Sequence, residues 1–155
     1  MKRKLFTSLL AGLFLTGIAF FATSCSDNND DIVETAWNVE NITVNASEWS
    51  WSPANRRWEV QKQLDYIDDF IYEDGAVIGY VFLGEQNVNE VQVQLPYVKS
   101  YRLADGEGGF FIFTETISYE YSILTNRATF FIEPSDGIRD DDAKATYNFR
   151  IVMIW

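Results

Sequence analysis

The sequence of 155 residues contains no histidine and only one cysteine, Cys25. Without an imidazole the chain has no Ser–His–Asp triad, no histidine general base and no histidine ligand for zinc. A single cysteine cannot form a disulfide within the chain. Because these absences remove the commonest hydrolytic and zinc chemistries, we expect a protein that is not an enzyme and that uses no cofactor.

Positive charge is scarce, with 12 Lys and Arg against 23 Asp and Glu and a formal net charge of −11. Three of the cations are Lys2, Arg3 and Lys4, and removal of these three takes the net charge from −11 to −14. A surface this acidic repels nucleic acid and anionic lipid headgroups. We therefore expect no nucleic-acid partner.

Residues 1–24 have the pattern of an export signal. Three basic residues precede an apolar stretch, Leu5–Phe21, and small residues follow it up to Cys25. A basic start, an apolar run and small residues before a cleavage point are typical of secretory signal peptides. The alternative is a membrane anchor, for which 17 residues is the lower limit of length. We interpret residues 1–24 as a signal peptide.

The segment Ala22-Thr23-Ser24-Cys25 resembles the lipobox of bacterial lipoproteins, in which the cysteine becomes the lipidated first residue. The resemblance implies a thioether-linked diacylglycerol on Cys25 and an acylated amino group. Several acyl chains together anchor a protein stably, whereas one is marginal. The membrane is then a partner through Cys25, and the implied location is the outer membrane.

Residues 25–35 read as an acidic flexible tether, because a run this polar cannot bury itself. Within it, Ser26–Asp31 resembles the short acidic tags that direct some Gram-negative lipoproteins to the cell exterior. Both interpretations can hold together. We expect the domain to face the cell exterior, with the periplasmic face as the alternative.

Residues 36–155 predict one all-β domain, an antiparallel β-sandwich of about eight or nine strands with one short helical turn. Asp68 is placed to cap that turn, and Gly75 to end it in a left-handed conformation. The segments 110–115 and 118–124 read as two strands or as one bent strand with a bulge. The other expected strands are 37–44, 58–64, 76–83, 91–95, 127–133 and 145–155.

Three segments are apolar on both phases of a strand, Val77–Leu83, Phe110–Phe113 and Phe149–Trp155. This pattern is typical of central strands covered on both faces and favours a sandwich over a barrel. If the domain leaves one such face uncovered, the face becomes an interaction patch.

As a whole, residues 36–155 resemble the small β-domains of uncharacterised surface lipoproteins. The resemblance rests on an early tryptophan-rich strand and on the segments DGAVIGYVFL, LPY and FRIVMI. It implies a fold and no particular chemistry, so candidate sites have to come from the residues themselves.

Three tryptophans are the first candidate site. Trp49 and Trp51 share a face if that stretch is extended, and Trp58 follows the turn beyond them. An aromatic platform of this kind is suited to sugar rings or peptide segments. The alternative is that all three belong to the core, since tryptophan is usually highly buried. Tyr119 and Tyr121 form a second pair with the same alternatives.

Acidic residues supply weaker candidates. The carboxylate pairs Asp68/Asp69, Glu73/Asp74 and Glu115/Glu120 are better explained as solvated surface than as an acid–base pair. Asp136, Asp140 and Asp142 form a possible calcium loop, although Arg139 within it opposes a cation. A hydrated surface loop is the alternative, and we expect no metal site.

Two functions follow from these residues. The first is a non-catalytic binding module for an extracellular ligand, either a glycan or a peptide, or for an envelope protein. The second is a structural subunit of a surface fibre or envelope complex, assembled through residues 145–155. A last strand with a free edge can pair with a neighbouring subunit.

Overall fold

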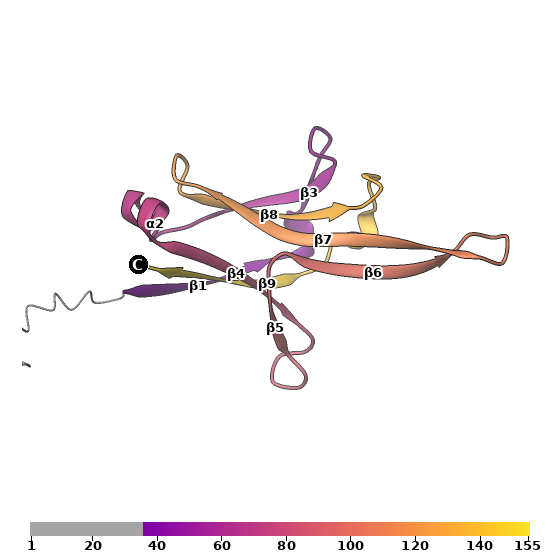
Figure 1. Cartoon of the computed structure of the whole chain (residues 1–155), viewed down its shortest axis with the longest axis horizontal. Coiled ribbons are helices and arrows are strands. Elements are labelled where there is room, and N and C mark those ends of the chain that lie inside the picture. The colour runs from indigo at the N-terminus through magenta and orange to yellow at the C-terminus, as the bar shows by residue number, and fades with distance from the viewer. Residues whose placement is uncertain (1–35) are drawn as a thin grey trace, which may run out of the picture. The chain divides into compact units, whose positions relative to one another are not determined.

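The computed structural model describes residues 36–155 and folds them into two antiparallel sheets with one short helix (Figure 1). This confirms the predicted all-β sandwich, with nine strands in the described part. The signal peptide 1–24, Cys25 and the tether 25–35 lie outside the described residues. Within 36–155, no helix is long and apolar enough to cross a membrane.

The first sheet has four strands, in which the last strand of the chain is an inner one. Their order in the sheet is β1 (Trp37–Val44), β9 (Tyr147–Ile154), β4 (Ala76–Leu83) and β5 (Val91–Gln94). The second sheet has five strands, in the order β2 (Ser50–Ser52), β3 (Arg57–Gln63), β8 (Arg127–Pro134), β7 (Phe110–Ser122) and β6 (Tyr97–Ala104).

The core lies between the two sheets and follows from the alternation of apolar residues along the strands. In β8 every second side chain is buried, including Phe130 and Ile132. Phe130 stacks on Phe149 of β9 with ring centroids 4.2 Å apart. Burying a side chain of this size contributes roughly 1.5–3 kcal/mol, so contacts of this kind hold the sheets together.

The helical turn is α2 (Asp69–Asp74), and its predicted N-cap is confirmed. Asp68 Oδ1 accepts a 2.8 Å hydrogen bond from the backbone N–H of Ile71. The left-handed ending predicted for Gly75 was wrong, because its φ is −94°. Glycine is needed there for space instead, since a Cβ would lie 2.7 Å from the carbonyl oxygens of Ile71 and Ile154.

The long strand β7 runs unbroken from Phe110 to Ser122. It pairs residue by residue with β6 and then with β8, so no bulge interrupts it near Glu115. Two strands were not predicted. The short β2 follows a 3₁₀ turn, Ala46–Glu48, and β6 follows Pro96 directly.

The last strand of the chain does not have the free edge that the alternative function, assembly into a fibre or complex, requires. Strand β9 is hydrogen-bonded to β1 on one side and to β4 on the other. The backbone of Trp155 is paired as well, since its N–H donates to Ala36 O at 2.9 Å and its carbonyl accepts from Ala36 N–H at 2.8 Å. Assembly through this strand would require it to leave its own sheet.

Strand β9 was expected to be covered by other residues on both of its faces, and the structure differs. Tyr147, Phe149, Ile151 and Met153 are buried, whereas the residues between them point outward and are partly or fully exposed. Strand β9 is thus central in its sheet but covered on one face only.

Candidate functional site

The hairpin formed by β6 and β7 extends beyond the sandwich, and Figure 1 shows it reaching away from the two sheets. Its turn is held by Asp105, whose Oδ1 accepts hydrogen bonds from the backbone N–H groups of Glu107 and Gly109, both at 2.9 Å. The start of β1, where the described chain begins, lies at the opposite end of the domain (Figure 1). The hairpin therefore points away from the point at which the chain enters the domain.

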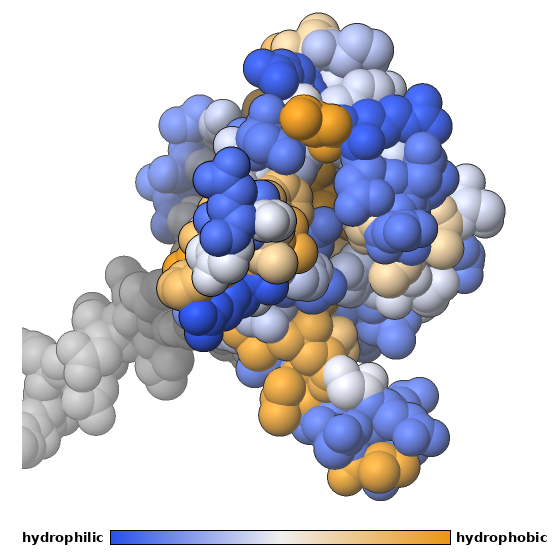
Figure 2. Space-filling model, turned by 90° about the vertical axis from the view of Figure 1, so that its right-hand side faces the viewer, coloured by the Kyte–Doolittle hydropathy of each residue, from blue (hydrophilic) through white to orange (hydrophobic). Residues whose placement is uncertain are grey.

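Apolar side chains of this hairpin are exposed. The exposed fractions are 50% for Phe111, 65% for Ile112 and 42% for Leu103. The prediction that Phe110–Phe113 is covered on both faces was wrong, because the sandwich ends before the hairpin does. Figure 2 looks onto this end of the domain and shows hydrophobic side chains among hydrophilic ones. Large apolar side chains exposed together on one hairpin make it a candidate interaction site.

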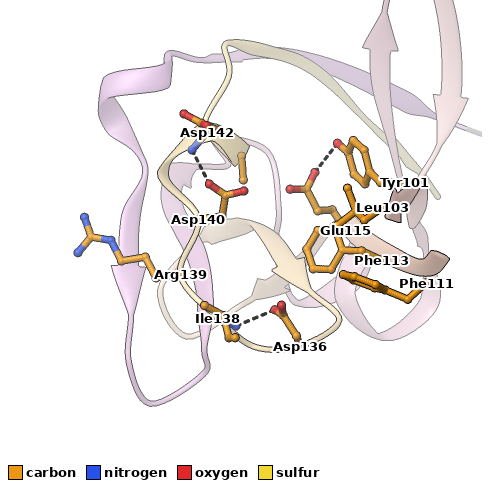
Figure 3. Close-up of a pocket in the computed structure, with 11 residues that line it drawn as sticks. Tyr101, Leu103, Phe111, Phe113, Glu115, Asp136, Ile138, Arg139, Asp140 and Asp142 are labelled. Carbon is orange, nitrogen blue, oxygen red and sulfur yellow. Dashed lines mark hydrogen bonds between the residues drawn. The ribbon is translucent and has the colours of Figure 1, made fainter. Parts of the chain in front are cut away.

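The inner face of the hairpin forms one wall of a groove of about 490 Å³ (Figure 3). A volume of this size is within the range of ligand pockets, roughly 300–1,000 Å³. The apolar and aromatic side chains of this wall belong to two adjacent strands and are Tyr101, Leu103, Phe111 and Phe113. The opposite wall is the loop after β8, which contributes Asp136, Ile138, Arg139, Asp140, Asp142 and Ala143.

Glu115 closes the inner end of the groove. It is 4% exposed and is the buried charged residue of the described chain. Tyr101 Oη donates a 2.7 Å hydrogen bond to Glu115 Oε2, as Figure 3 shows. Burial, together with the adjacent Glu115 carboxylate, raises the pKa of Tyr101, so the phenol stays protonated and remains a donor.

Lys99 lies beside this pair and is directly opposite Glu115 in the strand register. Its Nζ donates a 3.1 Å hydrogen bond to the hydroxyl of Tyr147. Burial acts to lower the pKa of Lys99, but the hydrogen bond to Tyr147 and the interactions with Tyr147 and Tyr101 together outweigh it, and the pKa is raised. The inner end of the groove thus holds one cation next to a buried carboxylate.

The acidic loop of the groove is held in shape by hydrogen bonds between its own carboxylates and its backbone. Asp136 Oδ1 accepts from Ile138 N–H, and Asp140 Oδ1 accepts from Asp142 N–H, both at 2.9 Å. Within residues 36–155, no group of three or more acidic, histidine or cysteine residues is placed to hold a metal ion. Asp136, Asp140 and Asp142 line the groove but do not converge as the possible calcium loop requires.

The three tryptophans do not form the exposed platform considered above. Trp49 and Trp58 are 5% and 3% exposed, so the core alternative holds for both. Their indole N–H groups donate to the carbonyls of Ala145 and Asp140, at 2.9 and 2.8 Å. Trp51 is half-buried and meets Trp58 edge-on, with ring centroids 5.4 Å apart. The bond from Trp58 to Asp140 fixes the loop that forms the second wall of the groove.

The remaining candidates are placed apart from one another. Glu120 lies on the opposite face of β7 from Glu115, because the two are an odd number of positions apart, and it binds Arg57 at 2.8 Å. Tyr119 and Tyr121 share a face and stack with centroids 6.3 Å apart, but both are half-buried.

The acidic residues around α2 are exposed as expected. Asp68 caps the helix, while Asp69, Glu73 and Asp74 lie at the surface.

The groove was not predicted from the sequence, because strand β6 was not predicted. The signal was present: Tyr97, Lys99, Tyr101 and Leu103 alternate with other side chains up to the glycine-rich turn, which is the pattern of a hairpin. Comparison with protein-family models, curated proteins and solved structures finds no match for this chain. Its function is therefore inferred from the groove itself.

Proposed function

We propose that the chain is a lipoprotein anchored in the outer membrane through Cys25, and that residues 36–155 face the cell exterior. In this proposal the domain is a non-catalytic binding module, and its ligand is a glycan, a peptide or an envelope protein. The observation that carries the proposal is the β6–β7 hairpin, whose apolar side chains are left uncovered around an aromatic groove.

Three further features support binding over catalysis. The carboxylates considered as an acid–base pair, Glu115 and Glu120, lie on opposite faces of β7. Glu115 is occupied by Tyr101, and the groove around it is lined mainly by apolar side chains. Hydrophobic and aromatic walls with a few fixed polar groups are typical of ligand-binding pockets.

The position of the hairpin suits an anchored protein. The start of β1 and the hairpin turn lie at opposite ends of the domain (Figure 1). A chain anchored ahead of Ala36 can therefore present the groove away from its attachment point. An extracellular protease added to intact cells should degrade the domain if it faces outward and leave it whole if it faces the periplasm.

Photocrosslinking on intact cells tests the binding function. The full chain is produced with the crosslinker p-benzoylphenylalanine in place of Phe111, and in a matched control in place of Leu124. Leu124 is 93% exposed and lies in the turn between β7 and β8, away from the groove. We expect a discrete adduct from position 111 and none from position 124, and digestion with a protease or a glycosidase identifies its class. Equal adducts at both positions, or none at position 111 in a folded chain, would overturn the proposal.

A further inference from the structure

Strand β6 offers a free main-chain edge beside the groove. It is the last strand of its sheet and pairs with β7 along all eight residues, Tyr97–Ala104. Its other side faces no strand in the described part of the chain. An extended segment can add to such an edge through backbone hydrogen bonds, while its side chains enter neighbouring pockets.

The groove beside this edge favours a positive charge. Four carboxylates line it, those of Glu115, Asp136, Asp140 and Asp142. Arg139 is the cation among the lining residues, and Asp141 binds its guanidinium at 3.1 and 3.2 Å. Figure 3 shows Arg139 directed away from the other lining side chains. Three other cations lie nearby, and each is already bound. Lys99 binds Tyr147, Lys144 binds Asp141, and Arg56 binds the carbonyls of Asp136 and Gly137.

The apolar and acidic parts of the groove follow one another along β6. Leu103 and Phe111 are paired toward the tip of the hairpin, Tyr101 and Phe113 come next, and Lys99 is paired with Glu115 at the inner end. Side chains on one face of a strand recur every second residue, roughly 7 Å apart. A strand added to β6 would thus place one side chain against the aromatic wall and the next on the same face near the carboxylates.

We infer that the groove binds an extended peptide segment of a partner protein, in which an apolar side chain and a lysine or arginine are two residues apart. The segment pairs with the free edge of β6, its apolar side chain contacts Leu103 and Phe111, and its basic side chain lies toward the carboxylates of the facing loop, such as Asp140. This inference rests on the proposed binding function and narrows its ligand to a basic, extended peptide.

The charge of this chain disfavours its own segments as the occupant. Residues 27–34 carry four acidic residues and no basic one, so they have the same sign as the groove. A second copy would bring the same acidic groove to the interface, because the two surfaces of a symmetric dimer are identical. A stable dimer of the isolated full chain, formed through β6, would contradict the inference.

The test uses the full chain extracted in detergent and a nine-residue synthetic peptide. Phenylalanine and lysine alternate at every second position of this peptide, with threonine between them. One control peptide carries glutamate for lysine. Two others are N-methylated at every second amide, one at the odd-numbered positions and the other at the even-numbered positions. Affinity is measured by isothermal titration, and the site by hydrogen–deuterium exchange.

We expect the lysine peptide to bind at least about tenfold more tightly than the glutamate peptide, the factor that corresponds to 1.4 kcal/mol. Exchange should slow at the backbone amides of Tyr97–Ala104. One of the two methylated peptides should lose binding, because alternate amides of a strand point to opposite sides. Equal affinity for the acidic peptide, or binding of both methylated peptides, would overturn the inference.

Two protein variants separate this inference from the proposed function. Phe111→Ser should lose at least about tenfold in affinity for the lysine peptide, whereas the matched surface variant Leu124→Ser should bind it unchanged. If the peptide does not bind but the crosslinked adduct at position 111 forms on cells, the peptide inference fails and the binding function stands. If neither occurs, both fail.

Discussion

The phenol ring of Tyr119 in β7 lies directly over the backbone of Gly79 in β4, and its hydroxyl donates a 2.8 Å hydrogen bond to the carbonyl of Val77. This contact joins the two sheets of the sandwich. A Cβ at position 79 would overlap the aromatic ring, so the glycine provides the room that the tyrosine occupies.

The first prediction concerns this contact. Gly79→Ala should lower the free energy of unfolding by about 1–3 kcal/mol, because overpacking forces the ring or the strand to shift. Urea unfolding followed by circular dichroism measures the change. In a Tyr119→Leu background the same alanine should cost much less. An equal cost in both backgrounds would show that the ring is not the cause.

The second prediction concerns alkaline pH. Burial, with a smaller contribution from Tyr121, raises the pKa of Tyr119 to about 12. A pKa raised from its ordinary value of 10.0 contributes stability below pH 10, which is lost as the pH rises toward 12. Tyr119→Phe should therefore weaken the alkaline fall in the urea midpoint. Tyr66→Phe, at an exposed position, controls for the loss of one phenol and should leave that fall unchanged.

The third prediction concerns acid pH and Glu48. Its Oε1 lies 2.6 Å from Lys62 Nζ, and this hydrogen bond, with one from Asn45 N–H, lowers the pKa of Glu48 to about 2. A lowered pKa contributes stability above its ordinary value of 4.5, which is lost as the pH falls toward 2. Glu48→Gln should make stability less dependent on pH between about 4.5 and 2. A slope identical to that of the unmodified chain, measured by urea unfolding, would refute this.

The fourth prediction separates core aromatics from hairpin aromatics. Phe130 is fully buried and stacks on Phe149, so Phe130→Ala should cost about 3–5 kcal/mol. Phe111 is half exposed, and Phe111→Ala should change the free energy of unfolding by less than about 1 kcal/mol. Chemical denaturation of the two variants gives the comparison. A large loss for Phe111→Ala would mean that the hairpin serves folding and not binding.

The fifth prediction concerns the anchor. A thioether to diacylglycerol requires a thiol, and Cys25 is the one cysteine of the chain. Cys25→Ser should abolish the added acyl mass, and the chain should no longer be cut after Ser24. Intact-mass spectrometry of the protein from cells measures both. An unchanged mass increment in the serine variant would rule out lipidation at this residue.

Much of the secondary structure could be predicted from short stretches of sequence. Runs of β-branched, aromatic and other apolar residues in 37–44, 76–83 and 127–133 indicated strands that the structure contains, and Asp68 indicated the start of the helix. Such signals are local. The alternation of a strand and the bond from a capping side chain to a nearby N–H group both involve residues that are close in the sequence. The strand β6 carried a comparable signal and was overlooked after Pro96.

The pairing of the strands, and which of their faces are buried, could not be predicted from short stretches of sequence. Phe110–Phe113 and Phe149–Trp155 have equally apolar patterns, yet the first segment leaves the sandwich and the second runs through its centre. The difference arises from which strands pair and in what register. This depends on residues far apart in the sequence, such as Val39 and Val152, which pair across more than a hundred residues.

The residue types of this chain were enough to establish strands, their inward faces and the absence of imidazole chemistry. Contacts between distant residues were required to decide which edge stays free and which aromatic residues stay uncovered. Trp49 and Trp58, for which a platform and the core were both considered, are buried, and their indole N–H groups bind the loop carbonyls of Ala145 and Asp140. Phe111, read as core, is exposed because its hairpin is longer than the sheet that faces it.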